Sequence, residues 1–163
     1  MQTNKFNQFN NYNNVVNIYD CFDYDRKINL MSGENSMYCN SCKKTCDFCM
    51  STKLITGPKI LIIILNRGKG IEFNVKINFL EILNLSNYIE FNNIDNAGCN
   101  YKLIGVICNN AESGMGGHFI AYCKDPLTDT WHKYNDAIVT DVINFQTEVI
   151  DCAMPYLLIY QKI

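Results

Sequence analysis

The stretch "GGHFIAYCKDPLTDTWHKYND", residues 116–136, decides the fold because it predicts two antiparallel strands joined by a short loop. Side chains alternate with a period of two over 118–124 and again over 130–135, as they do in strands with two different faces. The polar "DPLT" between them, residues 125–128, suits a four-residue hairpin loop. We therefore expect a β-hairpin here.

The charges at the loop suggest a register for this hairpin. If Lys124 pairs with Asp129, His118 lies directly opposite Asn135. Opposed residues have Cβ atoms about 4.5–5.5 Å apart, so the asparagine oxygen can accept the imidazole Nδ1–H. The same register also pairs Tyr122 with Trp131 and Phe119 with Tyr134.

A histidine oriented by an asparagine is the base half of a cysteine-peptidase triad. Asp136 points to the opposite face in this register, so Asn135 is the preferred orienting residue and Asp136 the alternative. Taken by itself, the hairpin equally allows a structural interpretation, in which aromatic pairs stabilise the strands and His118 and Asn135 are incidental.

A second motif is "CNSCKKTCDFC", residues 39–49, which contains two C-x-x-C units. Zinc sites are commonly built from two such units, so structural zinc is the expected cofactor. Three alternatives stay open: Cys39 and Cys42 bind with ligands elsewhere, Cys46 and Cys49 complete a tight four-cysteine site, or the thiols remain metal-free. We expect Cys39 and Cys42 at the tip of a two-stranded finger, flanked by Met37, Tyr38 and the segment after Thr52.

The other cysteines lie in or near apolar segments and are expected to be small buried hydrophobes. None has the surroundings of a catalytic thiol, which usually sits where a loop enters a helix N-terminus. They are Cys21, Cys99, Cys108, Cys123 and Cys152.

The rest of the chain predicts an α+β fold dominated by an antiparallel sheet. Helical spacing favours a short helix over residues 18–27. "PKILIIIL", residues 58–65, predicts a central strand buried on both faces. Further strands are expected at 71–79, 101–108 and 156–162.

Composition narrows the classes of function. A length of 163 residues fits one domain, and a net charge of −2 with pI near 5.6 argues against nucleic-acid or membrane partners. We expect residues 1–17, which are rich in asparagine, to be a disordered leader and not a secretory signal. Nine cysteines without an export signal predict an intracellular protein, cytoplasmic or nuclear.

Several blocks in order resemble the C-terminal half of the catalytic domain in the ubiquitin-specific protease family. The resemblance covers residues 18–163 and implies a truncated papain-like fold, mainly the antiparallel palm with part of a β-finger. The blocks are "YDCFDY", "GENSMYCNSCKK", "PKILIIILNR", "YKLIGVICN", "GGHFIAYCK", "WHKYNDAIV" and "PYLLIYQ".

The resemblance implies roles for individual residues. His118 takes the position of the catalytic base, and Asn135, followed by Asp136, that of the third triad member. Gly116 and Gly117 resemble the loop beside which the glycine tail of the substrate passes. Phe119 and Tyr122 resemble the aromatic neighbours of that tail, and Cys39 and Cys42 the second zinc pair.

The chain also departs from the family pattern. No cysteine box surrounding a nucleophile is present, and the first zinc C-x-x-C is missing. Cys46 and Cys49 stand where the family usually has other residues, and Phe119 stands where tyrosine is more usual.

Two functions follow from the resemblance. The first is deubiquitination, thiol-dependent hydrolysis after the C-terminal glycine of ubiquitin, with this chain supplying His and Asn and being inactive alone. The alternative is a non-catalytic module that binds ubiquitin or acts as a scaffold. The expected partners are ubiquitin and ubiquitinated proteins, and the expected state is a monomer.

Overall fold

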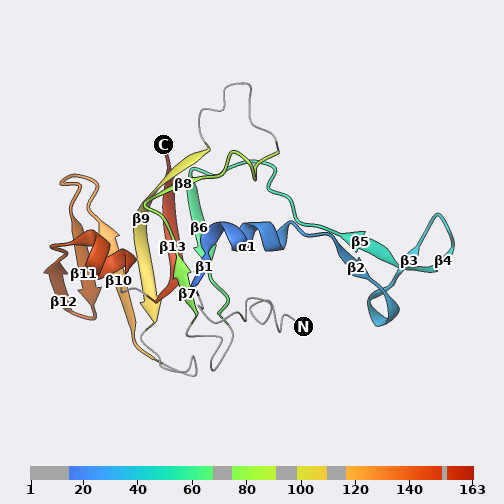
Figure 1. The fold of residues 1–163 in the computed structure, drawn as a ribbon, viewed down its shortest axis with the longest axis horizontal. Helices are drawn as coiled ribbons and strands as arrows, with labels where there is room; N and C mark the ends of the chain where they lie inside the picture. Colours follow the sequence, from blue (N-terminus) through green and yellow to red (C-terminus); the bar gives the residue numbers. More distant parts are fainter. Residues whose placement is uncertain (1–14, 68–74, 91–98, 110–116, 152–153) are drawn as a thin grey trace.

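The computed structural model describes residues 15–67, 75–90, 99–109, 117–151 and 154–163. Its main feature is a seven-stranded antiparallel sheet with the order β12-β11-β10-β9-β13-β6, in which β8 also pairs with β9 (Figure 1). The strands are β6 (Ile60–Ile64), β8 (Ile82–Asn84), β9 (Asn100–Asn109), β10 (Phe119–Lys124), β11 (Trp131–Asn135), β12 (Ile138–Asp141) and β13 (Pro155–Lys162).

The centre of this sheet is the pair β9 and β13. These are the two longest strands, and their ladder joins Tyr101 with Lys162 at one end and Cys108 with Pro155 at the other. Side chains of both strands enter one hydrophobic core, and a register irregularity between Ile159 and Tyr160 of β13 interrupts the period of two in β9 between Leu103 and Val106. The fully buried members from these strands are Tyr101, Leu103, Val106, Leu158 and Tyr160. The expected antiparallel sheet is thus confirmed.

A short helix, α1 (Ile18–Asp25), packs against that core through the buried Ile18. It begins at Asn17, whose Oδ1 accepts the N–H of Tyr19 at 3.0 Å while its own N–H donates to Asp20 Oδ2 at 2.9 Å. The helix expected over residues 18–27 is confirmed. Beside it, β1 (Val15–Asn17) pairs in parallel with β7 (Lys76–Asn78), within the segment expected as a strand at 71–79.

The position of β6 corrects the sequence prediction. Residues 58–65 were expected to form a central strand, but β6 lies at the edge of the sheet beside β13. Its alternate residues Ile60, Ile62 and Ile64 are 46%, 55% and 65% exposed. A continuous apolar run indicates that both faces are apolar, but it does not say whether both are covered.

The register of the β10–β11 hairpin also differs from the prediction. Lys124 pairs with Trp131 instead of Asp129, because the loop extends from residue 125 to 130. Asp125 builds this longer loop: its Oδ1 accepts the N–H groups of Leu127 at 2.7 Å and Thr128 at 3.3 Å. The predicted register is wrong by two positions, but an even shift leaves every side chain on its predicted face.

The shift replaces the predicted aromatic pairs. Tyr122 pairs with Lys133, and Tyr134 pairs with Ala121. Trp131 instead stacks on Phe145, with ring centroids 4.6 Å apart, just before a π-helical turn (Gln146–Ile150). Lys124 and Asp129 still form an ion pair at 2.8 Å.

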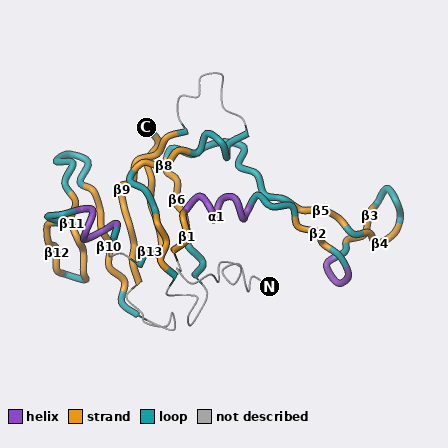
Figure 2. Tube along the Cα trace, in the orientation of Figure 1, coloured by secondary structure: helices purple, strands orange, loops and turns teal. Residues whose placement is uncertain are grey.

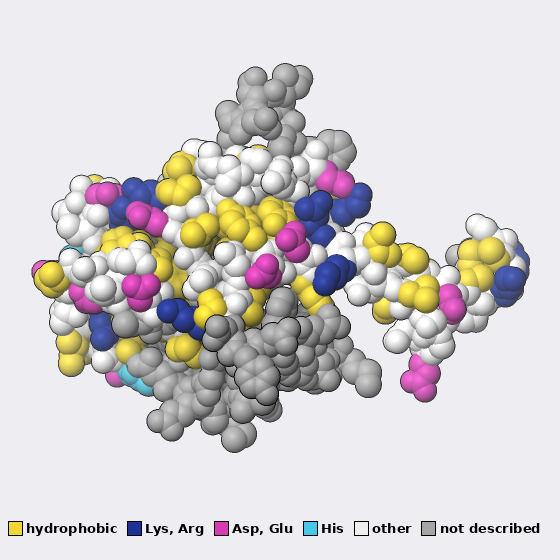
Figure 3. Space-filling model, in the orientation of Figure 1, with side chains coloured by type: hydrophobic (Ala, Val, Ile, Leu, Met, Phe, Trp, Pro, Cys, Tyr) yellow, Lys and Arg dark blue, Asp and Glu magenta, His cyan; other side chains and the backbone are white. Residues whose placement is uncertain are grey.

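An arm projects from the sheet and corresponds to the expected finger (Figure 2). It consists of two hairpins, β2 (Asn29–Met31) with β5 (Phe48–Met50), and β3 (Met37–Cys39) with β4 (Lys44–Cys46). The segment after Thr52 was expected to pair at the tip; the partner there is β4 instead. Figure 3 shows hydrophobic side chains along the arm, and the large exposed ones are Ile28, Leu30, Met37, Tyr38 and Met50.

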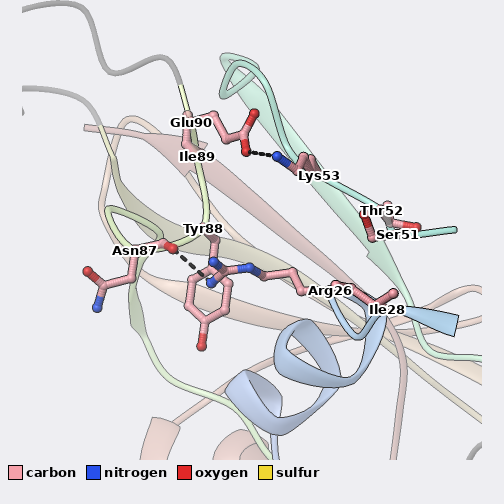
Figure 4. A pocket seen from close by; sticks show the side chains of 9 residues that line it. All are labelled: Arg26, Ile28, Ser51, Thr52, Lys53, Asn87, Tyr88, Ile89 and Glu90. Carbon is pink, nitrogen blue, oxygen red and sulfur yellow. Dashed lines mark hydrogen bonds and ion pairs between the residues drawn. The ribbon is translucent and has the colours of Figure 1, made fainter. Parts of the chain in front are cut away.

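Three contacts fix the base of the arm around a cavity of about 360 Å³ (Figure 4). Arg26, at the end of α1, donates from Nη1 to the carbonyl of Asn87 at 2.9 Å and lies over the ring of Tyr88. Lys53 forms an ion pair with Glu90 at 2.5 Å. These contacts join the first and last residues of the arm to the segment that follows β8.

The described ranges contain no helix that is long and apolar enough to cross a membrane.

Replacing Leu103 with alanine tests the central position of β9. Leu103 is fully buried, so Leu103→Ala should lower the free energy of unfolding by about 2–5 kcal/mol. Urea denaturation followed by circular dichroism measures this difference. Leu127→Ala is the matched control, because Leu127 is 93% exposed and its loss should change stability by less than about 0.5 kcal/mol. Equal losses for the two variants would contradict the assigned core.

Candidate functional site

The candidate site lies at one end of the β10–β11–β12 meander. His118 directly precedes β10, behind Gly117, whose φ of 135° favours glycine. Asn135 is the last residue of β11, and Asp136 begins the two-residue turn into β12 with a φ of 52°. Gly116, the other expected glycine, lies outside the described residues.

His118 and Asn135 are in contact, although not by the predicted pairing. His118 Nε2 donates a hydrogen bond to Asn135 Oδ1, since an amide oxygen can only accept. In the observed register the two residues are diagonal neighbours, and they share a face because the shift was even. The sequence prediction assigned this bond to Nδ1–H, which is wrong.

This correction decides which nitrogen can act as the base. With its proton on Nε2, the neutral imidazole carries its lone pair on Nδ1. Among the described residues no hydrogen bond occupies Nδ1, and the side chain of His118 is 46% exposed. Nδ1 can therefore accept a proton from a group that approaches from solvent or from another segment.

Asp136 lies on the side of His118, not on the opposite face as predicted. Its Oδ2 is 3.6 Å from His118 Nε2. The reason is backbone conformation: the positive φ of Asp136 ends the strand alternation on which the prediction relied. Because the Asp136 side chain is 80% exposed, its attraction for a protonated His118 is weakened by solvent.

The two aromatic candidates lie on different faces of β10. Phe119 is 50% exposed and packs edge-on against Tyr156, with ring centroids 5.5 Å apart. Tyr122 shares the face of His118 and packs against the hydrophobic core. Of the two, only Phe119 is exposed, and it lies on the face of β10 opposite that of His118.

The buried thiols and the half-buried thiol of Cys21 are poorly suited to nucleophilic catalysis. Burial raises the pKa of Cys108 to about 12 and that of Cys21 to about 11, so both remain protonated near neutral pH. Cys99 is also buried. Cys152 lies outside the described residues.

Arg67 was not recognised from the sequence as a structural residue. It is 3% exposed, and its guanidinium donates to the carbonyls of Pro155 and Val75, each at 2.6 Å. Burial lowers its pKa to about 10, so it stays charged. Arg67 thereby ties the segment after β6 to the start of β13. The only signal in the sequence was a basic residue two positions after the apolar run 58–65.

At the tip of the arm, Cys39 ends β3 and Cys42 lies in the turn. The N–H of Cys42 donates to Cys39 Sγ at 3.5 Å, and hydrogen bonds from Cys42 and Ser41 lower the pKa of Cys39. Hydrogen bonding with the thiols of Cys39 and Cys46 raises the pKa of Cys42. Of Cys39 and Cys42, Cys39 is thus the thiol that ionises more readily.

The fourth cysteine of the motif is separate from the tip. Cys49 is in β5, opposite Leu30, whereas Cys46 is in β4, opposite Met37. Within the ranges that the structure describes, no group of three or more His, Cys, Asp or Glu side chains is arranged to hold a metal ion. The residues present do not fit a four-cysteine zinc site, and zinc binding by Cys39 and Cys42 stays a prediction.

The comparisons with known proteins identify the family. The model of the ubiquitin carboxyl-terminal hydrolase family matches residues 26–160. This chain belongs to that family. It is 29% identical to Drosophila melanogaster Usp2, over 87% of this chain and 15% of the fly protein. It is 35% identical to Arabidopsis thaliana ubiquitin carboxyl-terminal hydrolase 25, over 68% of this chain and 17% of the plant protein.

Solved structures support the fold as well. The SAGA Ubp8/Sgf11/Sus1/Sgf73 DUB module bound to ubiquitin aldehyde matches with a TM-score of 0.70 and 27% identity, covering 91% of this chain and 34% of the matched chain. The family and the truncated papain-like fold expected from the sequence are confirmed. The chain spans less than half the length of these relatives.

Thiol alkylation tests the electrostatics of the arm. In buffer containing EDTA at pH 7, Cys39 should react with iodoacetamide several-fold faster than Cys42, because its lowered pKa leaves more thiolate. The difference should narrow as the pH rises above about 8.5, where an ordinary thiol also ionises. Peptide mass spectrometry measures both rates, and buried Cys108 serves as the slow internal control.

Zinc binding is tested separately by elemental analysis. We expect zinc on the purified reduced chain, and we expect Cys39→Ser to remove it because the site then loses one of its two predicted thiolate ligands. Cys49→Ser is the matched control, since Cys49 lies apart from the tip. Zinc far below one per chain, even after zinc is supplied, would contradict the ligand assignment.

Proposed function

We propose that this chain provides the base and the orienting residue of a Cys-His-Asn triad in a deubiquitinase. The observation that carries the proposal is the hydrogen bond from His118 Nε2 to Asn135 Oδ1, which leaves Nδ1 available as a base. Asp136 supplies additional negative charge near the ring. Family membership supports this function.

The nucleophilic thiol comes from a segment outside residues 1–163. In the described part of the chain, no thiol is hydrogen-bonded to His118, and burial keeps Cys21 and Cys108 protonated. Nδ1 removes the proton of the incoming thiol, and the Asn135 oxygen holds the imidazolium in place through Nε2–H.

The reaction then follows two steps of acyl transfer. The thiolate attacks the carbonyl carbon of the last ubiquitin residue, and the imidazolium of His118 gives its proton to the departing lysine amine. A water molecule, deprotonated by Nδ1, then attacks the acyl-enzyme and releases the ubiquitin carboxylate and the thiol. The base is thereby regenerated.

Ubiquitin and ubiquitinated proteins are the proposed partners, bound by a monomeric chain. The similar Ubp8 module is bound to ubiquitin aldehyde, which supports a ubiquitin tail at the equivalent place. We assign the passage of the tail to Gly116 and Gly117, because glycine lets a substrate approach the backbone closely. We assign an apolar contact with the tail to Phe119, which is exposed and follows His118 in the chain, and we assign to Tyr122, packed against the core, the support of the strand β10.

The second candidate function is a ubiquitin-binding or scaffold module without catalysis. It is favoured by one observation, that the His118 Nδ1 has no thiol partner among the described residues. The two functions make different predictions about activity when a nucleophile is provided.

A fluorogenic amide of the ubiquitin C-terminus separates the two. The isolated chain should not release the fluorophore, and activity should appear when an upstream segment carrying a cysteine box is joined to it. In that enzyme His118→Ala should abolish turnover. Asn135→Ala should lower kcat by at most about 10⁴-fold, because the base remains. Leu127→Ala, far from the site in its exposed loop, should have the parental kcat.

Two results would contradict the catalytic proposal. One is turnover in the joined enzyme that survives His118→Ala. The other is thiol-dependent cleavage by the isolated chain that disappears when one of its nine cysteines is replaced. No turnover in any joined enzyme, with ubiquitin binding retained, would favour the scaffold.

A further inference from the structure

A second histidine of the same meander belongs to a hydrogen-bonded relay that the proposed deubiquitinase reaction does not use. His132 in β11 and Asp141 in β12 are directly paired across the ladder. Thr130 lies two residues before His132, where the hairpin loop enters β11. The three side chains are joined in the order threonine, histidine and aspartate.

The chemistry of the partners fixes the protons along this relay. The Asp141 carboxylate can only accept, so His132 Nδ1–H donates to Asp141 Oδ1 at 3.0 Å. The lone pair of the neutral ring is then on Nε2, which lies 3.1 Å from Thr130 Oγ1 and accepts its hydroxyl hydrogen. This is the order of atoms by which a carboxylate and an imidazole activate a hydroxyl nucleophile.

A further hydroxyl extends the relay at its other end. Thr128 Oγ1 is 2.6 Å from Thr130 Oγ1. Because the Thr130 hydrogen is directed at His132, the hydroxyl of Thr128 must donate to the Thr130 oxygen. An oxygen that receives this hydrogen bond is stabilised as negative charge develops on it.

The loop holds these groups in place. The carboxylate of Asp125 accepts the N–H of Thr128 at 3.3 Å, and the N–H of Asp125 donates to the carbonyl of Thr130 at 2.8 Å. Thr128 and Thr130 are therefore positioned by backbone contacts as well as by their own hydroxyls. A nucleophile that is already oriented loses little entropy on reaction.

The relay is separate from the site around His118. His132 and Asn135 are three positions apart in β11, so their side chains project from opposite faces of the sheet. The side chain of His132 is 24% exposed and that of Asp141 is 79% exposed. A small reagent can reach the relay without passing the candidate deubiquitinase site.

We propose that Thr130 is a base-activated acyl acceptor, a site of covalent modification by activated esters or thioesters. Thr130 Oγ1 forms a bond to the acyl carbon while His132 Nε2 takes the hydroxyl proton. The tetrahedral intermediate collapses by breaking the bond to the leaving alkoxide or thiolate, and the proton passes from His132 to that group or to water. The product is an O-acyl threonine, and no oxidant or reductant is needed.

The modification occurs once per chain and does not require turnover. A nucleophile and a base suffice when the acyl donor is already activated, because the leaving group then departs readily. The inference is independent of the proposed deubiquitinase function, since none of its groups contacts His118 or Asn135.

Acetylation by p-nitrophenyl acetate tests the proposal on the full chain. Released nitrophenolate gives the total rate, and peptide mass spectrometry gives the rate at each residue. We expect Thr130 to be acetylated about tenfold or more faster than Thr140, an exposed threonine in β12 that pairs with Lys133. His132→Ala should reduce labelling of Thr130 to the level of Thr140, and Asp141→Asn should reduce it less.

The controls distinguish activation from a structural role. Circular dichroism and thermal unfolding establish that each variant folds, and Thr140→Ala should leave the labelling of Thr130 unchanged. If a variant fails to fold, chemical modification of the parental chain replaces it. Modification of His132 by diethyl pyrocarbonate should suppress labelling of Thr130. Labelling of Thr130 no faster than that of Thr140, or unaffected by loss or modification of His132, would overturn the proposal.

Discussion

The pairing of β9 with β13 is the constraint on which the other elements depend. It brings the end of the chain against a strand that begins at Asn100, and it buries Tyr101 and Tyr160 in one core. Both tyrosine hydroxyls bond to carbonyls outside the sheet, Tyr101 to Pro58 at 3.0 Å and Tyr160 to Leu80 at 2.7 Å. These bonds satisfy polar atoms that burial would otherwise leave without water. The meander that carries His118 is attached through β10, which pairs with residues 105–109 of β9. Its position therefore follows from this central pair.

The sequence contained enough information for the elements and for the faces of the site. Alternation identified β9, β10, β11 and β13, and the pairing of His118 with Asn135 survived an error in register because the error was even. Ordered motifs along the chain were sufficient to identify the family, since their combination is more specific than any single one.

The remaining features depended on interactions that the hydrophobic pattern of the sequence does not reveal. The longer loop arises from the carboxylate of Asp125, and Asp136 reaches His118 because one residue adopts a positive φ. The edge position of β6 depends on which strands find partners, not on its own composition. β12 was missed since its apolar and polar residues do not alternate along the sequence, and the relay of His132 and Asp141 was missed with it.

The arm is built differently from the sheet that carries it. Each of its strands has three residues, most of its side chains are exposed, and its attachment is concentrated at the base around Arg26 and Lys53. Mutations beyond that base remove little buried surface, so natural selection on folding acts weakly there. The arm can therefore lose, gain or replace cysteines at little cost to the folding of the sheet that carries His118.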